Sequence, residues 1–231
     1  MRELWEGCKD AVNLLISLDR EVYRIILLSL YVSLTSTFFS AILGAPLGIL
    51  LGVKDFPIKR HLVRFLYTLM SLPPVIAGLV VFLMISRKGP LGFMRLSYTS
   101  TAMIIAQTCL VTPIIIGLVY NGTKEKGKVV QTLGKTLGAS RFQRLILLMK
   151  ELRVHLLTAV VSGYGRAVSE VGAVMIVGGN IKGHTRVMTT TIAMLQSMGD
   201  YNMAIAIGLV LLLLSFVVNA ILYYYQQGEQ E

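Results

Sequence analysis

The chain has 231 residues, of which 55% are hydrophobic and only 15% are charged, a composition typical of a membrane protein rather than of a soluble domain. The formal net charge of +10 could suggest nucleic acid as a partner, but apolar runs of membrane-spanning length on both sides of the basic segment exclude that class. Two unrelated cysteines and three scattered histidines show neither a disulfide framework nor the ligand spacing of a metal site.

Residues 1–20 precede the first apolar run. Acidic residues interrupt this segment and no small-residue cleavage site follows it, so it is not a cleavable signal peptide. Its apolar residues predict a short amphipathic helix that lies at the membrane interface: Leu4, Trp5, Val12, Leu15 and Ile16.

Five apolar segments predict an all-α membrane protein in which residues 1–231 form a single transmembrane domain. The predicted spans are residues 25–53, 62–85, 101–120, 154–177 and 203–225. The first span repeats small residues at every fourth position: Ser36, Ser40, Gly44, Gly48 and Gly52. Such a stripe predicts a surface for close helix packing, and it leaves contact with another subunit open.

Pro73 and Pro74 interrupt the second span near its middle and remove two backbone donors. Broken helices often line translocation paths in transporters, but a simple packing kink explains the prolines equally well. Both interpretations stay open at this point.

Residues 121–153 form a polar region that carries eight Lys and Arg residues against two glutamates after Asn121–Thr123. A long basic loop between spans belongs on the cytoplasmic side of the membrane. Its apolar spacing predicts two short helices that meet at a bend, where Gly138 stops the first helix and Ser140, with Gln143, caps the second. The region is either a solvated, positive-inside loop or a docking element for another protein.

Gly134-Lys135-Thr136 resembles the end of a phosphate-binding loop, but that motif requires a glycine where this chain has Val129. We therefore expect no ATP, and no other cofactor, to be bound by this chain.

Arg166 and Glu170 are the only charges deep inside a predicted span. Because they are four residues apart, we expect them to share a helix face and to neutralise each other. Ionisable groups at this depth usually face the bundle interior or a water-filled path. A purely structural ion pair and a role in gating are both open, and nearby Gly172 leaves room for tight packing.

Residues 178–186 form a glycine-rich loop that contains Asn180, Thr185 and Arg186, and a threonine-rich turn with Thr189 and Thr190 follows it. Free amides, hydroxyls and cations are the donors that an oxyanion requires, although any external loop can contain them. The distribution of cations between the two sides predicts an external N-terminus and a cytoplasmic C-terminus.

The segment after Gln131 resembles the coupling loop in permease subunits of type I ABC importers, which inserts into a groove on an ATP-hydrolysing subunit. The matching residues are Thr136, Leu137, Gly138, Ala139, Ser140, Arg141 and Phe142. Residues 165–173 and 177–180 are similar to the molybdate, sulfate and tungstate permeases of that class, and residues 183–190 look most like the tungstate type. The resemblance covers nearly the whole chain.

This resemblance implies a type I ABC importer permease fold in a bacterial or archaeal plasma membrane. It also implies a second copy of the chain, two ABC ATPase subunits that bind ATP and magnesium, an extracytoplasmic oxyanion-binding protein and a cargo of tungstate, with molybdate or sulfate next. Coupling would run through residues 131–150. The candidates for the translocation path or gate are Arg166, Glu170, Gly172, Asn180, Thr185, Arg186, Thr189 and Thr190.

The sequence shows no catalytic grouping of Ser, His and Asp and no paired intramembrane acids, so we do not expect an enzyme. Two other classes remain as alternatives: a non-transporting membrane scaffold and an autonomous ion-coupled carrier. Dependence on partners distinguishes them, because only an ABC permease requires both an ATPase and a binding protein.

Overall fold

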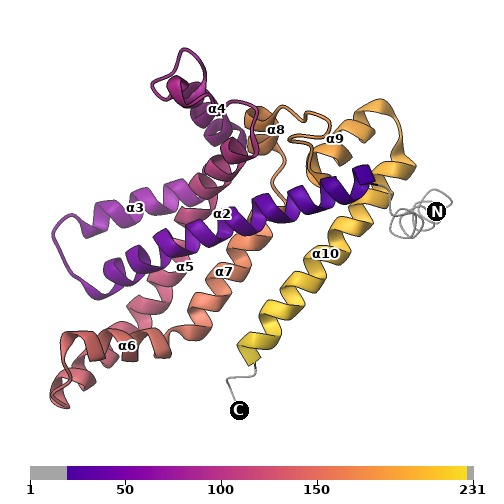
Figure 1. The fold of residues 1–231 in the computed structure, drawn as a ribbon. Helices are drawn as coiled ribbons and strands as arrows, with labels where there is room; N and C mark the ends of the chain where they lie inside the picture. The colour runs from indigo at the N-terminus through magenta and orange to yellow at the C-terminus, as the bar shows by residue number, and fades with distance from the viewer. Residues whose placement is uncertain (1–19, 228–231) are drawn as a thin grey trace.

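The computed structural model describes residues 20–227, which form nine α-helices and one short 3-10 helix (Figure 1). The α-helices are α2 (Arg20–Val53), α3 (Lys59–Met70), α4 (Pro74–Ile85), α5 (Ser100–Thr136), α6 (Arg141–Glu151), α7 (Arg153–Val168), α8 (Gly172–Gly178), α9 (Met188–Met198) and α10 (Tyr201–Gln227), and the 3-10 helix spans Gly92–Met94. The predicted all-α class is confirmed for this part of the chain. The interfacial helix predicted over residues 1–20 lies, apart from Arg20, outside the described residues.

The two longest helices, α2 and α5, pack side by side through the centre of the molecule (Figure 1). A Cβ atom added at Gly48 of α2 would lie 2.8 Å from the carbonyl oxygen of Ile116, and one at Gly52 would lie 2.4 Å from the side chain of Thr123. Only a small residue permits backbones to approach so closely. The packing surface predicted for the first span is confirmed, and its partner is a helix of the same chain.

Two helix pairs are sharply bent, α3 with α4 by 98° and α7 with α8 by 58°. Within the described residues, α2, α5 and α10 are long and apolar enough to cross a membrane, and the number rises to five if each bent pair forms one span. The break between α3 and α4 lies at the predicted prolines, because Pro73 is extended (ψ 127°) and Pro74 opens the next helix.

Two predicted boundaries were wrong. The third span and the first helix of the basic region are one uninterrupted helix, α5. Gly122 lies inside this helix and serves close packing, since a Cβ there would lie 2.4 Å from the ring of His155 on α7. The predicted threonine-rich turn is the first turn of α9, where the Thr190 hydroxyl accepts a hydrogen bond from the Val187 N–H at 3.2 Å.

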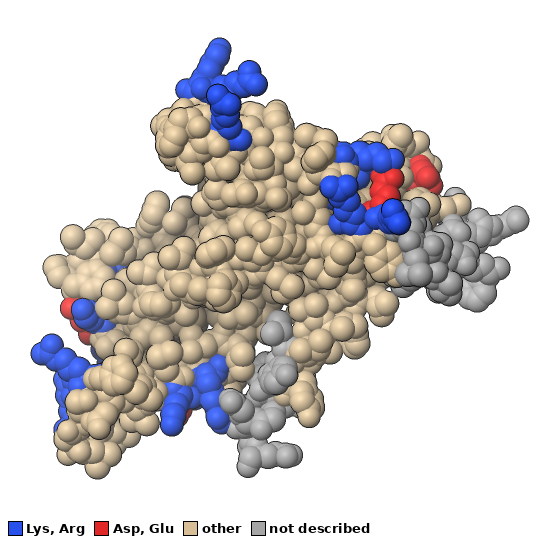
Figure 2. All heavy atoms as spheres, in the orientation of Figure 1, with Lys and Arg blue, Asp and Glu red and all other residues tan. Residues whose placement is uncertain are grey.

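Charged side chains gather at opposite ends of the molecule. On the face shown in Figure 2, Lys and Arg cluster near α6 at one end and near the loops around α4 and α9 at the other, with a largely apolar band between them. Exposed apolar side chains of α2 and α10 lie in this band, among them Phe38, Ile42, Leu212 and Phe216. An apolar belt between charged ends is the surface that a bilayer requires.

Candidate functional site

The α5–α6 corner, residues 134–144, is closed by backbone hydrogen bonds. Gly138 adopts a left-handed φ of 71°. The Ala139 N–H donates to the Gly134 carbonyl at 2.8 Å, and the Gly138 N–H donates to the Lys135 carbonyl at 3.1 Å. This pair of bonds is a Schellman motif, which satisfies carbonyls that the end of a helix would otherwise leave free. The left-handed stop predicted at Gly138 is confirmed.

α6 begins with the predicted capping box. The Ser140 N–H donates to Oε1 of Gln143 at 2.8 Å, and the Gln143 N–H donates to Oγ of Ser140 at 3.3 Å. Each side chain thus satisfies a backbone donor that the first turn of a helix cannot pair. The corner is therefore specified on both sides of the bend by local hydrogen bonds.

Side-chain contacts fix α6 against the end of α5. A Cβ at Gly134 would lie 2.7 Å from Cγ of Arg144, whose Nη1 donates to the Ala139 carbonyl at 3.0 Å. An ion pair between Lys126 and Glu151 (3.0 Å) joins the two helices further along. Two leucines are fully buried at the base of this contact: Leu148 and Leu152. These contacts hold the corner as one rigid projection.

The outer surface of the α5–α6 corner is apolar. Leu137 is 82% exposed and Phe142 is 70% exposed, although each is large and hydrophobic. Further exposed apolar side chains surround them on the same two helices: Val129, Leu133, Leu145, Ile146 and Met149. A solvated connector would place polar residues here, whereas exposed apolar patches of this kind occur where a protein contacts another protein or a membrane. Contact between this surface and an ATPase stays a prediction.

The loop between α2 and α3 is tied to the same end of α5 through Asp55. Its carboxylate accepts a hydrogen bond from Lys59 Nζ at 2.9 Å and lies 3.5 Å from Lys128 Nζ on α5. The hydrogen bond from Lys59 and the nearby charge of Lys128 lower the pKa of Asp55. This pair of contacts holds the loop between α2 and α3 against the part of α5 that precedes the α5–α6 corner.

Glu170 bridges the break between α7 and α8. Its carboxylate is 4% exposed, and Oε2 lies 3.3 Å from Nη2 of Arg166, which is 36% exposed. Its Oε1 accepts a hydrogen bond from the Ala173 N–H at 3.0 Å, in the first turn of α8. The ion pair expected from the sequence is present, but the shared helix face was wrong, because α7 ends at Val168 and Glu170 lies in the break.

The half-helices α4 and α8, each of which follows a break, pack directly on each other. A Cβ at Gly78 of α4 would lie 2.6 Å from the Cα of Ala173, and one at Gly172 of α8 would lie 2.9 Å from the Val75 side chain. The two backbones are therefore in contact, and Gly172 has a packing role. Because this contact leaves no space for a larger residue, neither half-helix can move closer to the other.

The loop from α8 to α9 is held together by its own polar groups. Thr185 Oγ1 donates to the Gly178 carbonyl and accepts from the Ile181 N–H at 3.0 Å. Asn180 adopts a left-handed φ of 49°, and its Oδ1 accepts from the Thr190 hydroxyl at 3.0 Å. Two further bonds complete the set, Thr189 Oγ1 to the Glu170 carbonyl and Arg186 Nη2 to the Asn180 carbonyl.

These contacts bring all eight predicted path residues into one connected region. Arg166 and Gly172 adjoin Glu170, and Thr189 connects Glu170 to the loop that contains Asn180. The threonine hydroxyls are buried and bonded within the chain, and of the two cations Arg166 (36% exposed) is more exposed than Arg186 (17% exposed). Contact between these residues and an oxyanion stays a prediction.

Gln107 of α5 is a buried polar residue that the sequence analysis missed. Its Oε1 accepts a hydrogen bond from the Ser36 hydroxyl at 2.8 Å, and its Nε2 donates to the Ala167 carbonyl at 2.9 Å. It thereby joins α2, α5 and α7 close to the break at Glu170. The signal was available, because Gln107 is the one long polar side chain in the apolar run over residues 101–120.

Together, the apolar belt and the broken helices define a multi-span membrane component. Among residues 20–227 no group of three or more His, Cys, Asp or Glu residues is arranged to hold a metal ion. The chain matches the family described as binding-protein-dependent transport system inner membrane component over residues 44–229, and it belongs to that family. It is thus a non-catalytic ABC permease subunit, and the ATPase is a partner.

Individual relatives extend this assignment. The chain is 56% identical to the tungstate uptake system permease protein TupB of Peptoclostridium acidaminophilum, over 98% of this chain and 100% of the relative. It is 37% identical to TupB of Campylobacter jejuni, over 94% of this chain and 91% of the relative. It is 28% identical to the sulfate transport system permease protein CysT of Escherichia coli, over 86% of this chain and 75% of the relative.

Proposed function

We propose that this protein is the membrane-spanning subunit of an ATP-driven tungstate importer, with molybdate and sulfate as the next candidates. The observation that carries the proposal is the 56% identity to a tungstate uptake permease over nearly the full length of both chains. The lower identity to a sulfate permease supports a cargo from the tetrahedral oxyanions and favours tungstate among them. The whole chain acts as one transmembrane domain.

The α5–α6 corner couples the permease to its ATPase. Leu137 and Phe142 insert into a groove on the partner, because both are large, apolar and exposed on a rigid projection. Gly138 sets the bend between them, and Ser140 fixes the start of the second helix. The remaining members of the coupling segment are Thr136, Ala139 and Arg141, within the broader region 131–150. Two copies of the chain would present two such corners to two ATPase subunits.

The path is formed by five spans, with each bent helix pair counted as one span. The basic α5–α6 end is cytoplasmic by the positive-inside rule, so the C-terminus would lie inside and the N-terminus outside. In a bacterial or archaeal plasma membrane, an extracytoplasmic binding protein would deliver the oxyanion to the loops beside α4 and α9. Labelling of a Gly228→Cys variant lacking Cys8 and Cys109 tests this topology, and reaction with an external reagent would overturn it.

The break at Glu170 serves as part of the gate. Closure of the ATPases would rotate the two permease chains as rigid bodies and open the path to alternate sides. The close contact between the half-helices α4 and α8 supports this role, because a shift of one toward the other would have to displace it. Arg166, as the partly exposed cation beside the break, is the best placed of the predicted residues to contact an anion.

Tagged purification from native membranes provides the deciding experiment. The complex would be assayed for ATPase activity with its binding protein and with tungstate, molybdate or sulfate in turn. Stimulation at the lowest concentration by tungstate is the expected result, and stimulation first by sulfate or molybdate would reassign the cargo. Isolation of the chain with no ATPase would reject the importer and favour a scaffold or an ion-coupled carrier.

A further inference from the structure

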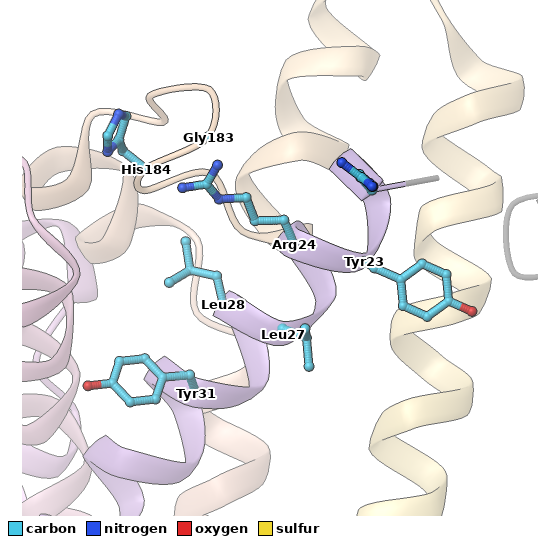
Figure 3. Close-up of a pocket in the computed structure, with 8 residues that line it drawn as sticks. Tyr23, Arg24, Leu27, Leu28, Tyr31, Gly183 and His184 are labelled. Carbon is cyan, nitrogen blue, oxygen red and sulfur yellow. The ribbon is translucent and has the colours of Figure 1, made fainter. Parts of the chain in front are cut away.

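A cavity of about 570 Å³ opens beside the first turns of α2 (Figure 3). Its walls come from α2 and from the loop between α8 and α9. The residues that matter to its chemistry are Arg20, Arg24, Leu27, Leu28, Tyr31 and His184. It lies at the end of the molecule opposite the α5–α6 corner (Figure 1).

The α2 wall changes from cationic to apolar along the helix. Arg20, Arg24, Leu27 and Tyr31 follow one another at the three-to-four spacing of a single helix face. The two arginines lie in the first turns of α2. Further along the helix, Leu27 is 63% exposed and Tyr31 is 55% exposed. The cavity thus offers positive charge at the membrane edge and apolar contact toward the membrane interior.

The loop supplies the opposite wall. Arg24 extends toward Gly183 and His184 (Figure 3), and a Cβ added at Gly183 would lie 3.4 Å from Nη1 of Arg24. A phosphate between Arg24 and the exposed His184 would meet donors from both elements. Guanidinium groups suit phosphate particularly well because they donate two parallel hydrogen bonds.

The nearby acid is engaged elsewhere. Glu21 lies 2.8 Å from Lys182 and 3.9 Å from Arg186. Among residues 20–227, no carboxylate forms an ion pair with either arginine of the cavity, Arg20 or Arg24.

We infer that this cavity binds an anionic phospholipid, with its phosphate between Arg24 and His184 and an acyl chain along Leu27 and Tyr31. A small hydrated oxyanion would gain nothing from the apolar wall, whereas a lipid uses both parts of the cavity. Basic pockets at the membrane edge of transmembrane helices recognise anionic headgroups in this way. The inference does not depend on the identity of the transported cargo.

Native mass spectrometry of the purified protein tests the site with phosphatidylglycerol and phosphatidylcholine of the same acyl chains. We expect preferential retention of phosphatidylglycerol, and a roughly five-fold loss of that preference in Arg24→Gln, the factor for one cation near a headgroup. Arg87→Gln is the matched control, because Arg87 is an exposed cation on the loop after α4, outside this cavity. Equal thermal unfolding of both variants in phosphatidylcholine would establish that they fold alike.

Competition separates a lipid from a free anion. Glycerol 3-phosphate and tungstate, added separately in excess, should leave phosphatidylglycerol bound if the acyl chain contributes. Displacement by either competitor would assign the cavity to a free anion and overturn the inference. Equal retention of the two lipids, or equal losses in Arg24→Gln and Arg87→Gln, would overturn it as well.

Discussion

The chain turns at the α5–α6 corner and at the break between α7 and α8, and these two turns differ in what surrounds them. At the corner, hydrogen bonds between residues no more than five apart close the bend, and a Cβ at Gly138 would meet nothing within 4 Å. At the break, the carboxylate of Glu170 is buried, and Ala173 touches the backbone of α4. Local bonds contribute to both turns, because Glu170 also pairs with Arg166 and Ala173, but the second turn is in addition buried, packed on α4 and bonded by Thr189 from 19 residues away.

This difference matches the demands of the proposed mechanism. A surface that transmits force from an ATPase must keep its shape when the partner moves, and local capping bonds persist through rigid-body motion. A gate must respond to the packing around it, and Glu170 ties α7 to α8 where α8 meets α4. Local closure suits the docking surface, and closure through distant contacts suits the gate.

Replacement of Gly138 should have the largest effect on transport. Gly138→Val should abolish cargo-stimulated ATPase activity and uptake while membrane insertion continues, because a β-branched residue strongly disfavours a φ of 71°. Gly138→Asn is the matched control, since asparagine tolerates this conformation, and it should retain most of the uptake. Uptake in Gly138→Val at the wild-type rate would remove the basis for the docking proposal.

Gly78 of α4 tests the packing of α4 against α8, next to the break between α7 and α8. Gly78→Ala should destabilise the protein by about 1–3 kcal/mol, because its Cβ would lie 2.6 Å from a backbone atom of α8. Gly165→Ala makes the same change in α7, where a Cβ would meet nothing within 4 Å, and it should be neutral or stabilising. Thermal unfolding in detergent measures both variants. Equal melting temperatures would show that α4 and α8 are less tightly packed than described.

Two substitutions of Glu170 separate the effect of its ion pair with Arg166 from the effect of its hydrogen bond with Ala173. Glu170→Gln should cost about 1 kcal/mol, because it removes the charge opposite the partly exposed Arg166 but keeps an acceptor for the Ala173 N–H. Glu170→Ala should cost about 1 kcal/mol more, since it also removes the acceptor at the start of α8. Melting temperature and uptake, measured together, distinguish structure from gating. An unchanged melting temperature and unchanged uptake in both variants would show that the Arg166–Glu170 ion pair contributes to neither stability nor transport.

Sequence analysis predicted the α5–α6 corner because its signals are local. A glycine stop and a Ser–Gln capping box act within a few residues, so Gly138 and Ser140 could be assigned without knowledge of the fold. Pro73 and Pro74 predicted the break between α3 and α4 for the same reason, because a proline acts on the backbone next to it. The small-residue stripe of α2 likewise predicted close packing, although it could not identify α5 as the partner.

The features that the sequence did not reveal depend on distant contacts. Helical spacing correctly predicted that Arg166 and Glu170 form an ion pair. It did not predict the helix break, because no residue between them is typical of a helix end. The break forms where α8 packs on α4. Gln107 was visible as a polar side chain in an apolar run, but its partners could not be identified, because Ser36 and Ala167 lie 71 and 60 residues away. Periodicity identifies which residues are apolar or buried, but it does not pair segments that are far apart in the chain.

The smallest predicted effect concerns the cap at the start of α6. Ser140→Ala should weaken the first turn by about 1 kcal/mol, because the Gln143 N–H loses its acceptor. Hydrogen exchange at the Gln143 amide should accelerate roughly five-fold, the factor for that energy, while amides at buried Leu148 keep their protection. Ser140→Asp restores an acceptor and should restore slow exchange. If Ser140→Ala instead accelerated exchange at Leu148 as strongly as at Gln143, the corner would depend on the surrounding fold, and its contrast with the Glu170 break would disappear.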